Sequence, residues 1–150
     1  MRQEIITTSK EETIRFGQKL AARLSSGAVI ALSGDLGAGK TTLTQGLLSG
    51  LGVAGPYTSP TFVIMKQYDI SPEAHKGIRR AYHADAYRIG TQEMLSIGWE
   101  EWMEDPAGIV IAEWPERIAD IIPESAISLS LQWLDETRRR IVIENGGGEM

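Results

Sequence analysis

Residues 28–42 read AVIALSGDLGAGKTT. The apolar run at its start is typical of a buried strand, and a glycine-rich loop follows directly. Because glycine has no Cβ and adopts positive φ freely, such a loop can turn its backbone N–H groups inward. Four residues complete the P-loop pattern G-x-x-x-x-G-K-[ST]: Gly34, Gly39, Lys40 and Thr41. The stretch therefore predicts a strand, a loop around a phosphate group and a helix that begins near Lys40.

Each part of this loop suits a phosphate. The N–H groups of residues 37–41 can point into the loop, where the dipole of the following helix adds partial positive charge. Lys40 would reach the β- and γ-phosphates, and Thr41 would offer its hydroxyl to Mg²⁺. The alternative interpretation is an ordinary glycine-rich turn with a solvated lysine. At average residue usage, roughly one chain in a hundred of this length would carry the pattern by chance.

Composition narrows the class of protein. The chain has 150 residues, 42% hydrophobic and 23% charged, which predicts one globular domain over residues 1–144 and a disordered tail over 145–150. There is no cysteine, which excludes disulfides, thiolate metal sites and cysteine nucleophiles. A net charge of −5 disfavours direct binding to DNA or RNA. We find no signal-peptide pattern and no apolar run of membrane-spanning length, so we expect a cytoplasmic protein without membrane contacts.

Helical and strand patterns alternate along the chain. Ser9 precedes Glu12 by three residues, a capping-box signature for the helix that follows. Further helices are predicted at 40–51 and at 91–103, the second divided at Gly98. Strands are predicted at 3–7, 28–33, 62–68, 78–87, 108–114, 126–134 and 138–144. The pattern indicates an α/β, P-loop NTPase-like sandwich with a mostly parallel central sheet and a C-terminal antiparallel hairpin.

Two acidic residues stand late in predicted strands. In HADAYR, Asp85 shares one strand face with His83, and in GIVIAEWPE an apolar run leads to Glu113. A carboxylate there can face the loop and hold Mg²⁺ or position an attacking water. The alternatives are an edge strand with a solvated face for Asp85 and a solvent-facing acid for Glu113. Spacing does not decide which of the two carboxylates contacts the metal.

The segment TSPTF at 58–62 lies between the P-loop helix and the next strand. A segment in this place can sense a γ-phosphate, because its hydroxyl groups can bond a phosphate or a water on the metal. A Ser-Pro turn that enters a strand is an equal alternative.

Taken together, GDLGAGKTT, SPTF, HADAYR and EWPE, in this order and at these separations, resemble the bacterial TsaE family, also called YjeE. The resemblance covers nearly the whole chain. It implies a small Mg²⁺-dependent P-loop ATPase required for threonylcarbamoyl modification of the adenosine beside the anticodon in tRNA. It also implies that the protein acts with the TsaB–TsaD heterodimer, which performs the transfer, and reaches tRNA only through that complex.

The resemblance also assigns site residues. It implies that phosphate is bound by the loop residues Asp35, Leu36, Gly37, Ala38, Gly39 and Lys40, with Thr42 and Thr61 nearby. It implies that Thr41, Asp85 and Glu113 surround Mg²⁺, the two acids being the catalytic candidates. An arginine near the nucleotide in this family corresponds to Arg138, Arg139 or Arg140, and we favour Arg138.

Aromatic and histidine side chains receive more ordinary interpretations. Trp114 follows Glu113 directly and is expected near the nucleotide. The other three tryptophans are expected in the core or at a partner surface, since large amphipathic rings usually serve packing. His83 is expected to be a hydrogen-bonded structural histidine rather than a general base.

Two alternative functions stay open. A small-molecule kinase would share the P-loop and the acids, but it usually needs an arginine-bearing lid. The longest spare segment, 91–107, contains no arginine. A nucleotide-binding module without turnover would carry the same motifs. A GTPase is disfavoured, because the tetrapeptide N-K-x-D does not occur.

Overall fold

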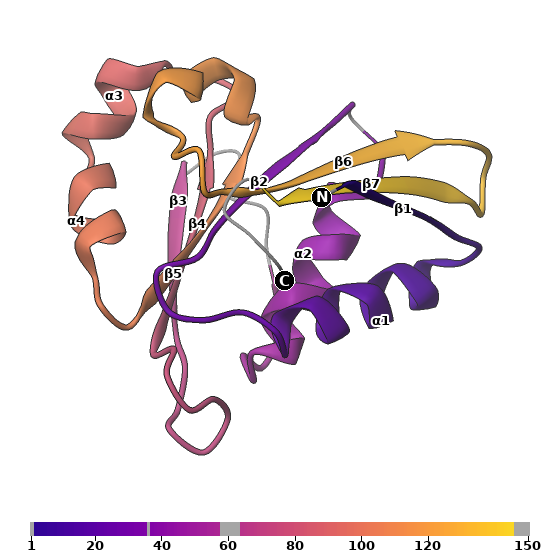
Figure 1. Cartoon of the computed structure of the whole chain (residues 1–150), viewed down its shortest axis with the longest axis horizontal. Helices are drawn as coiled ribbons and strands as arrows, with labels where there is room; N and C mark the ends of the chain where they lie inside the picture. Colours follow the sequence, from indigo (N-terminus) through magenta and orange to yellow (C-terminus); the bar gives the residue numbers. More distant parts are fainter. Residues whose placement is uncertain (1, 36, 58–63, 146–150) are drawn as a thin grey trace.

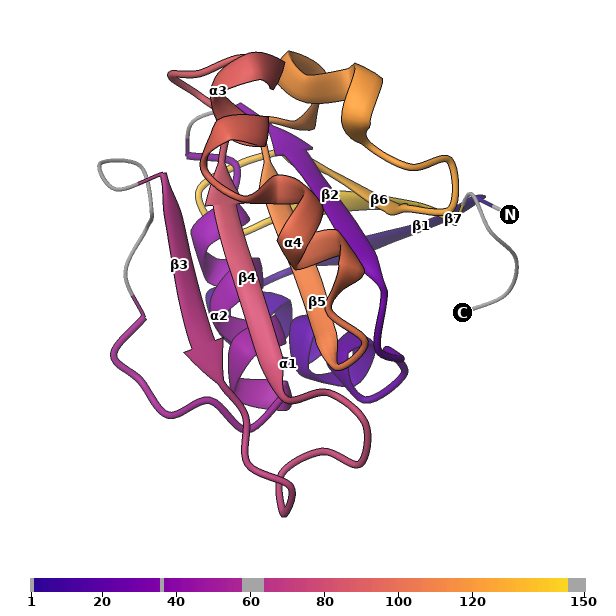
Figure 2. The ribbon, with the colours of Figure 1, turned by 90° about the vertical axis from the view of Figure 1, so that its left-hand side faces the viewer.

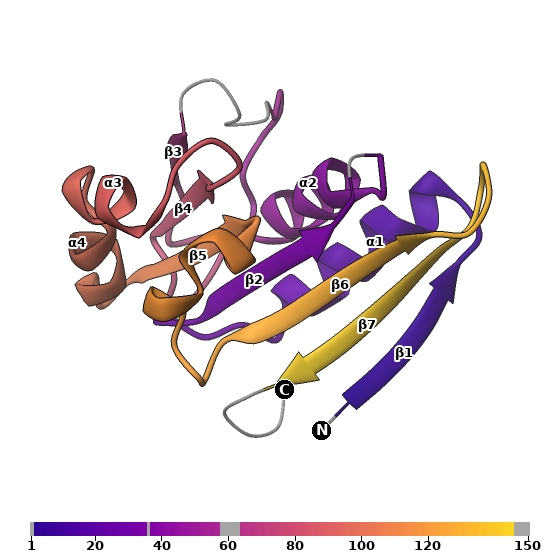
Figure 3. The same cartoon turned by 90° about the horizontal axis from the view of Figure 1, so that it is seen from above.

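The computed structural model describes residues 2–35, 37–57 and 64–145. Among them, seven strands form one sheet in the order β1-β7-β6-β2-β5-β4-β3 (Figures 1 and 3). The strands are β1 (Arg2–Thr7), β2 (Val29–Gly34), β3 (Met65–Asp69), β4 (Arg80–Asp85), β5 (Gly108–Glu113), β6 (Ile127–Trp133) and β7 (Arg139–Asn145). The central strands β6, β2, β5 and β4 run parallel, and β3, β7 and β1 are antiparallel to their neighbours. The predicted α/β fold with its C-terminal antiparallel hairpin is confirmed.

Helices cover the two faces of the sheet unequally (Figures 2 and 3). The helices are α1 (Lys10–Ala21), α2 (Lys40–Gly50), α3 (Thr91–Ser96), α4 (Trp99–Glu104) and the 3₁₀ helix η1 (Pro115–Ile121). α1 and α2 lie against one face, while α3, α4 and η1 cover the other face over β4, β5 and β2. None of the helices in the described ranges is both long and apolar enough to cross a membrane.

Alternation along the strands builds a core on each face. Ile30 and Leu32 of β2 belong to the cluster that includes α2, whereas Val29 and Ala31 belong to the opposite cluster with Trp99. In α2, four buried leucines recur at helical spacing: Leu43, Leu47, Leu48 and Leu51, the last being the C-cap. The central strands are therefore buried on both faces, which agrees with their nearly continuous apolar sequences.

Several element boundaries differ from the sequence prediction. β4 is shorter at both ends than 78–87, and β7 includes Asn145, which was assigned to the tail. Gly98, with φ 122°, divides the helical segment 91–103 as expected. Residues 58–63, which include the whole of TSPTF and the start of one predicted strand, lie outside the described residues, as do 146–150.

The start of α1 follows the capping prediction in part. The Ser9 side chain accepts a hydrogen bond from the backbone N–H of Glu12 at 3.1 Å. The Glu12 carboxylate, however, accepts from the N–H and the hydroxyl of Thr8, at 3.1 and 2.5 Å, rather than from the Ser9 backbone. The cap is therefore built around two residues that precede the helix.

Glycine allows α1 and α2 to approach closely. A Cβ built on Gly46 of α2 would lie 2.3 Å from the backbone carbonyl oxygen of Ile14 in α1. A Cβ on Gly17 of α1 would lie 2.8 Å from the carbonyl oxygen of Leu43. Since real Cβ atoms do not approach backbone oxygens so closely, a larger residue at either position must push the helices apart.

We expect Gly46→Ala to lower the free energy of unfolding by about 2 kcal/mol, because overpacking outweighs the better helix propensity of alanine. Urea denaturation followed by circular dichroism measures this change. Gly77→Ala is the matched control, since a Cβ at Gly77 meets no atom within 4 Å. The control should change stability by no more than about 0.5 kcal/mol. Equal stability of the two variants would contradict the close-packing role of Gly46.

The half-buried Asp105 carboxylate ties α4 to β4 at the end of the strands opposite the glycine loop. Asp105 accepts hydrogen bonds from Arg80 Nε and Nη2 at 2.5 and 2.8 Å, and from the Tyr82 hydroxyl at 2.6 Å. The backbone N–H of Ala107 donates at 2.9 Å. These hydrogen bonds, those from Arg80 foremost, hold the pKa of Asp105 well below its ordinary value of 3.8. The cluster therefore stabilises the fold only while Asp105 is ionised.

The pH dependence of stability follows from the sign of this shift. Because the pKa of Asp105 is lower in the folded protein, its contribution is complete above pH 3.8 and is lost as the pH falls below that value. Asp105→Asn should cost about 2 kcal/mol at pH 7 and much less at pH 2. Denaturation at both pH values tests this. Glu101→Gln serves as a control, because Glu101 is exposed and has no hydrogen bond or ion pair within the described ranges. An undiminished difference at pH 2 would contradict the assignment.

Candidate functional site

The glycine loop runs from the end of β2 to the start of α2, as the sequence predicts. Gly34, Gly37 and Gly39 have φ values of 142°, 82° and 103°, a region that L side chains rarely adopt. A Cβ on Gly34 would also lie 2.7 Å from the carbonyl oxygen of Leu131. α2 begins behind Gly39 without a side-chain cap, so its first N–H groups face the loop uncapped. This end of α2 is therefore free to hold an anion.

Lys40 is buried at the base of this loop, with 6% of its surface exposed. Its Nζ donates a hydrogen bond to the carbonyl oxygen of Gly34 and lies 3.7 Å from the centre of the Trp114 ring. Burial lowers the pKa of Lys40, and the nearby carboxylates, Glu113 first and Asp85 next, oppose that shift. No carboxylate oxygen within the described ranges lies within 4.0 Å of Nζ. The lysine is thus surrounded by negative charge without a direct ion pair.

Asp85 and Glu113 lie side by side at the carboxyl ends of β4 and β5, where they are register partners. Each is 4% exposed, and both share the strand face that carries α2. The alternative interpretations are wrong on this point, since β4 is an interior strand and neither acid faces solvent. Asp85 Oδ1 accepts the N–H of Tyr87 at 2.8 Å. The structure therefore brings Lys40 and both predicted acids to one place.

His83 contacts one of these acids directly. Its Nε2 lies 2.6 Å from Glu113 Oε2, and His83 is 3% exposed. His83 Nδ1 is buried and has no hydrogen-bond partner within the described ranges. The expectation of a hydrogen-bonded histidine is met, and its partner is one of the two acids that the sequence predicts to be functional.

The chemistry of the donors fits Mg²⁺ bound together with a nucleotide. Across the described residues, no three His, Cys, Asp or Glu side chains converge into a metal site. Mg²⁺ is usually held by one or two carboxylates, substrate phosphates and several waters, so two adjacent carboxylates near a phosphate loop are the expected set. Thr41 is exposed in the first turn of α2, beside Lys40. Leu36 lies outside the described residues, and Asp35 is exposed in the loop.

Of the three candidate arginines, Arg139 contacts the loop, and Arg138, the residue favoured from the sequence, is held elsewhere. Arg138 is held in the β6–β7 turn, where its Nε donates to Asp135 at 2.6 Å. Arg139 instead reaches the P-loop, with Nη2 3.5 Å from the Gly37 carbonyl oxygen. Its Nε is buried without a hydrogen-bond partner and would lie 3.7 Å from a Cβ on Gly39. The preference for Arg138 does not fit this geometry.

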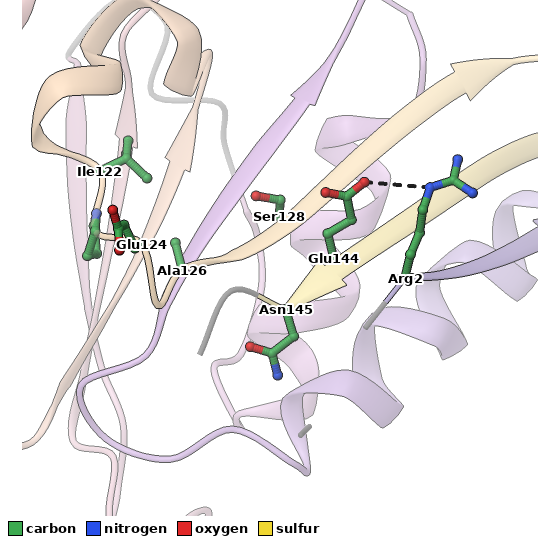
Figure 4. A pocket seen from close by; sticks show the side chains of 8 residues that line it. Arg2, Ile122, Glu124, Ala126, Ser128, Glu144 and Asn145 are labelled. Atoms are coloured by element: carbon green, nitrogen blue, oxygen red, sulfur yellow. Dashed lines mark ion pairs between the residues drawn. The ribbon is translucent and has the colours of Figure 1, made fainter. Parts of the chain in front are cut away.

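A hollow of about 210 Å³ adjoins the loop on this side. Its lining residues are Ser9, Lys10, Thr13, Gly39, Thr42, Glu136, Thr137 and Arg139. A larger hollow of about 550 Å³, lined by Arg2, Ile122, Glu144 and others, lies at the opposite end of β6 and β7 (Figure 4). None of the P-loop residues lines the larger hollow, whereas Gly39 lines the smaller one.

The four tryptophans lie in different environments, and two of them are in the core. Trp99 and Trp102 are buried in the second core, and Trp133 is 57% exposed. Trp114 has φ 58°, and this left-handed turn puts its ring over Lys40 and 4.9 Å from the Tyr87 ring centre. Glu116, which the sequence analysis did not single out, also acts on the charge of Lys40. In the sequence, only its position in the EWPE motif could have indicated that Glu116 lies near the site.

A glycine loop of this conformation, followed by a helix with an uncapped N-terminus and a buried lysine, is built to hold phosphate groups. Fold and site together put the chain in the class of P-loop-type nucleotide-binding proteins. The model of the family described as "Threonylcarbamoyl adenosine biosynthesis protein TsaE" matches residues 7–141. The chain belongs to the TsaE family, as the sequence motifs predicted.

Similar proteins agree with this assignment. The TsaE protein of Nostoc sp. is 41% identical over 143 residues, which cover 93% of this chain and 84% of that protein. TsaE of Treponema pallidum is 34% identical, covering 92% of this chain and 97% of its own. The crystal structure of Bacillus subtilis YdiB superimposes with a TM-score of 0.79 at 28% identity, covering 98% of this chain and 87% of that one.

Proposed function

We propose that this protein is a Mg²⁺-dependent ATPase that serves tRNA threonylcarbamoyladenosine biosynthesis in the cytoplasm, together with TsaB and TsaD. The observation that carries the ATPase proposal is the convergence of buried Lys40 with the paired carboxylates of Asp85 and Glu113. Membership of the TsaE family supports the pathway. The net charge of −5 supports contact with tRNA only through the partners.

The residues divide the work of phosphoryl transfer to water. The loop N–H groups and the N-terminus of α2 bind the phosphates, and Lys40 adds a positive charge at the β- and γ-phosphates. Thr41 and one of the two carboxylates would hold Mg²⁺, which when bound neutralises charge that develops on the phosphates. The other carboxylate would orient the attacking water. Catalysis here rests on positioning and electrostatics rather than on a covalent intermediate.

The hollow beside the loop supports a place for the nucleoside. Gly39 and Thr42, at the start of α2, line it together with Arg139 of β7. The guanidinium can contact the nucleotide from there, while Arg138 is engaged by Asp135. We therefore assign to Arg139 the role first given to Arg138.

Arg139→Ala should weaken ATP binding about tenfold, the loss expected for one charged hydrogen bond. Arg138→Ala is the matched control, since it removes the neighbouring arginine without touching the loop, and should leave the affinity unchanged. Isothermal titration of both variants with Mg²⁺–ATP measures the difference. A loss confined to Arg138→Ala would restore the original assignment.

ATP hydrolysis by the purified protein, alone and with an added TsaB–TsaD pair, tests the function. We expect slow release of inorganic phosphate by the protein alone and strong stimulation by the pair, as when a partner completes a P-loop site. Slow release that the pair does not change would contradict the partner-gated function. Binding without any release would indicate a nucleotide-binding module.

A further inference from the structure

We propose that His83 is a positioning residue that keeps the Glu113 carboxylate from pairing with Lys40, so that the lysine stays available to a phosphate. The inference rests on the proposed nucleotide site. It gives a role in that site to a histidine that the sequence suggested to be merely structural.

The His83–Glu113 hydrogen bond has a defined direction. An ionised carboxylate only accepts hydrogen bonds, so Nε2 must carry the proton that it shares with Oε2 across 2.6 Å. Nδ1 is buried without a partner within the described ranges, which fits the tautomer protonated on Nε2. The single N–H group of the neutral His83 ring therefore donates to Glu113.

The position of His83 in β4 decides from which side its ring reaches Glu113. His83 stands two residues before Asp85 on the same face of β4, and its register partner in β5 is Ile111, two residues before Glu113. The ring therefore approaches Glu113 from the middle of the sheet. This side is away from the carboxyl ends of the strands, where the loop lies. A hydrogen bond from that side draws the carboxylate inward.

Without His83, the charges of Glu113 and Lys40 would attract each other. Of the carboxylates that act on Lys40, Glu113 has the largest effect, yet no ion pair joins them. Lys40 is instead held by the Gly34 carbonyl oxygen and the Trp114 ring. A buried carboxylate without a partner is strongly unfavourable, so Glu113 deprived of His83 would turn to a cation on which its charge already acts. That cation is the flexible Lys40 side chain, whose charge the phosphates need.

Binding of ADP and of ATP, measured by isothermal titration calorimetry in EDTA and in Mg²⁺, tests this competition. His83→Leu should weaken both affinities about tenfold even in EDTA, the loss of one charged contact to phosphate. His83→Gln should stay close to the unaltered protein, because its amide nitrogen can donate from the Nε2 position. The decisive variant combines His83→Leu with Glu113→Gln. A neutral glutamine side chain in place of Glu113 cannot capture the lysine, so the double variant should regain the lost affinity.

Two further variants serve as controls for this test. Tyr82→Phe alters the neighbouring buried residue of β4 on the opposite face, where the hydroxyl bonds Asp105, and should leave binding unchanged. If His83→Leu does not fold, His83→Asn replaces it, since its shorter amide lies near the Nδ1 position and does not reach Glu113.

The outcomes separate the inference from the proposed function. Absence of nucleotide binding by the unaltered protein would overturn the proposed function itself. Normal binding by the unaltered protein and equally tight binding by His83→Leu would overturn only the role of His83. A loss in His83→Leu that Glu113→Gln does not restore would also overturn it, because a structural defect is not repaired by removing a second charge.

Discussion

Replacement of Lys40 by alanine is expected to weaken ATP binding by about 100-fold. Lys40 is 6% exposed, so its charge acts in a site with little solvent screening. A charged hydrogen bond contributes about 1.5–3 kcal/mol, or roughly 10- to 100-fold in affinity, and burial favours the upper end. Isothermal titration with Mg²⁺–ATP measures the loss directly. Unchanged affinity would remove the loop from the nucleotide site.

Lys76→Ala is the matched control for this substitution. Lys76 is exposed in the connection between β3 and β4, at the end of the sheet opposite the P-loop. Its replacement removes the same charge from the protein, so a general effect of net charge would appear in both variants. Only the Lys40 variant should lose affinity, with equal thermal stability in both.

Much of the fold could be predicted because its signals are local. The glycines at 34, 37 and 39 all take positive φ, as a glycine-rich loop allows. The leucines of α2 and the apolar run of β2 are buried as their spacing predicts. Gly98 breaks one helical pattern into two short helices. In each case a few adjacent residues determine the backbone, so no knowledge of distant contacts was needed.

The choice among the three arginines depends on a single residue of register, and the geometry favours Arg139 over the Arg138 preferred from the sequence. Neighbouring residues in a strand face opposite sides of the sheet, so a shift of one position exchanges Arg138 for Arg139. The turn before β7 determines which arginine is the first residue of the strand. Asp135 accepts hydrogen bonds from the backbone N–H groups of Thr137 and Arg138, and from the Arg138 guanidinium. That arrangement starts β7 at Arg139 and retains Arg138 in the turn.

The contact between His83 and Glu113 could not be predicted from the sequence either. The two residues are 30 positions apart, and the parallel pairing of β4 with β5 brings them together. Sequence spacing showed only that each lies late in a strand. Which acid holds the metal was left open for the same reason, since side-chain partners across strands decide how each carboxylate is turned.

Glu113→Gln is expected to leave ATP affinity within about twofold and to lower partner-stimulated phosphate release by about 100-fold or more, the usual contribution of a group that positions or deprotonates water. The glutamine keeps the size of the side chain, and its amide oxygen still accepts the hydrogen bond from His83. The loss should therefore reflect the missing charge rather than a disturbed core.

Asp85→Asn provides the comparison that separates the two roles. Asp85 occupies the neighbouring register position, is equally buried and accepts the N–H of Tyr87 at 2.8 Å, so the substitution is as conservative as the one at Glu113. We expect it to weaken ATP binding in Mg²⁺ but not in EDTA, as the loss of a metal ligand should. The opposite pattern, with Mg²⁺-dependent binding lost in Glu113→Gln, would make Glu113 the metal ligand. Asp85 would then be the residue that positions the attacking water. Full binding and full turnover in both variants would remove the paired carboxylates from the reaction, because two buried charges at this edge of the sheet would then serve the fold alone.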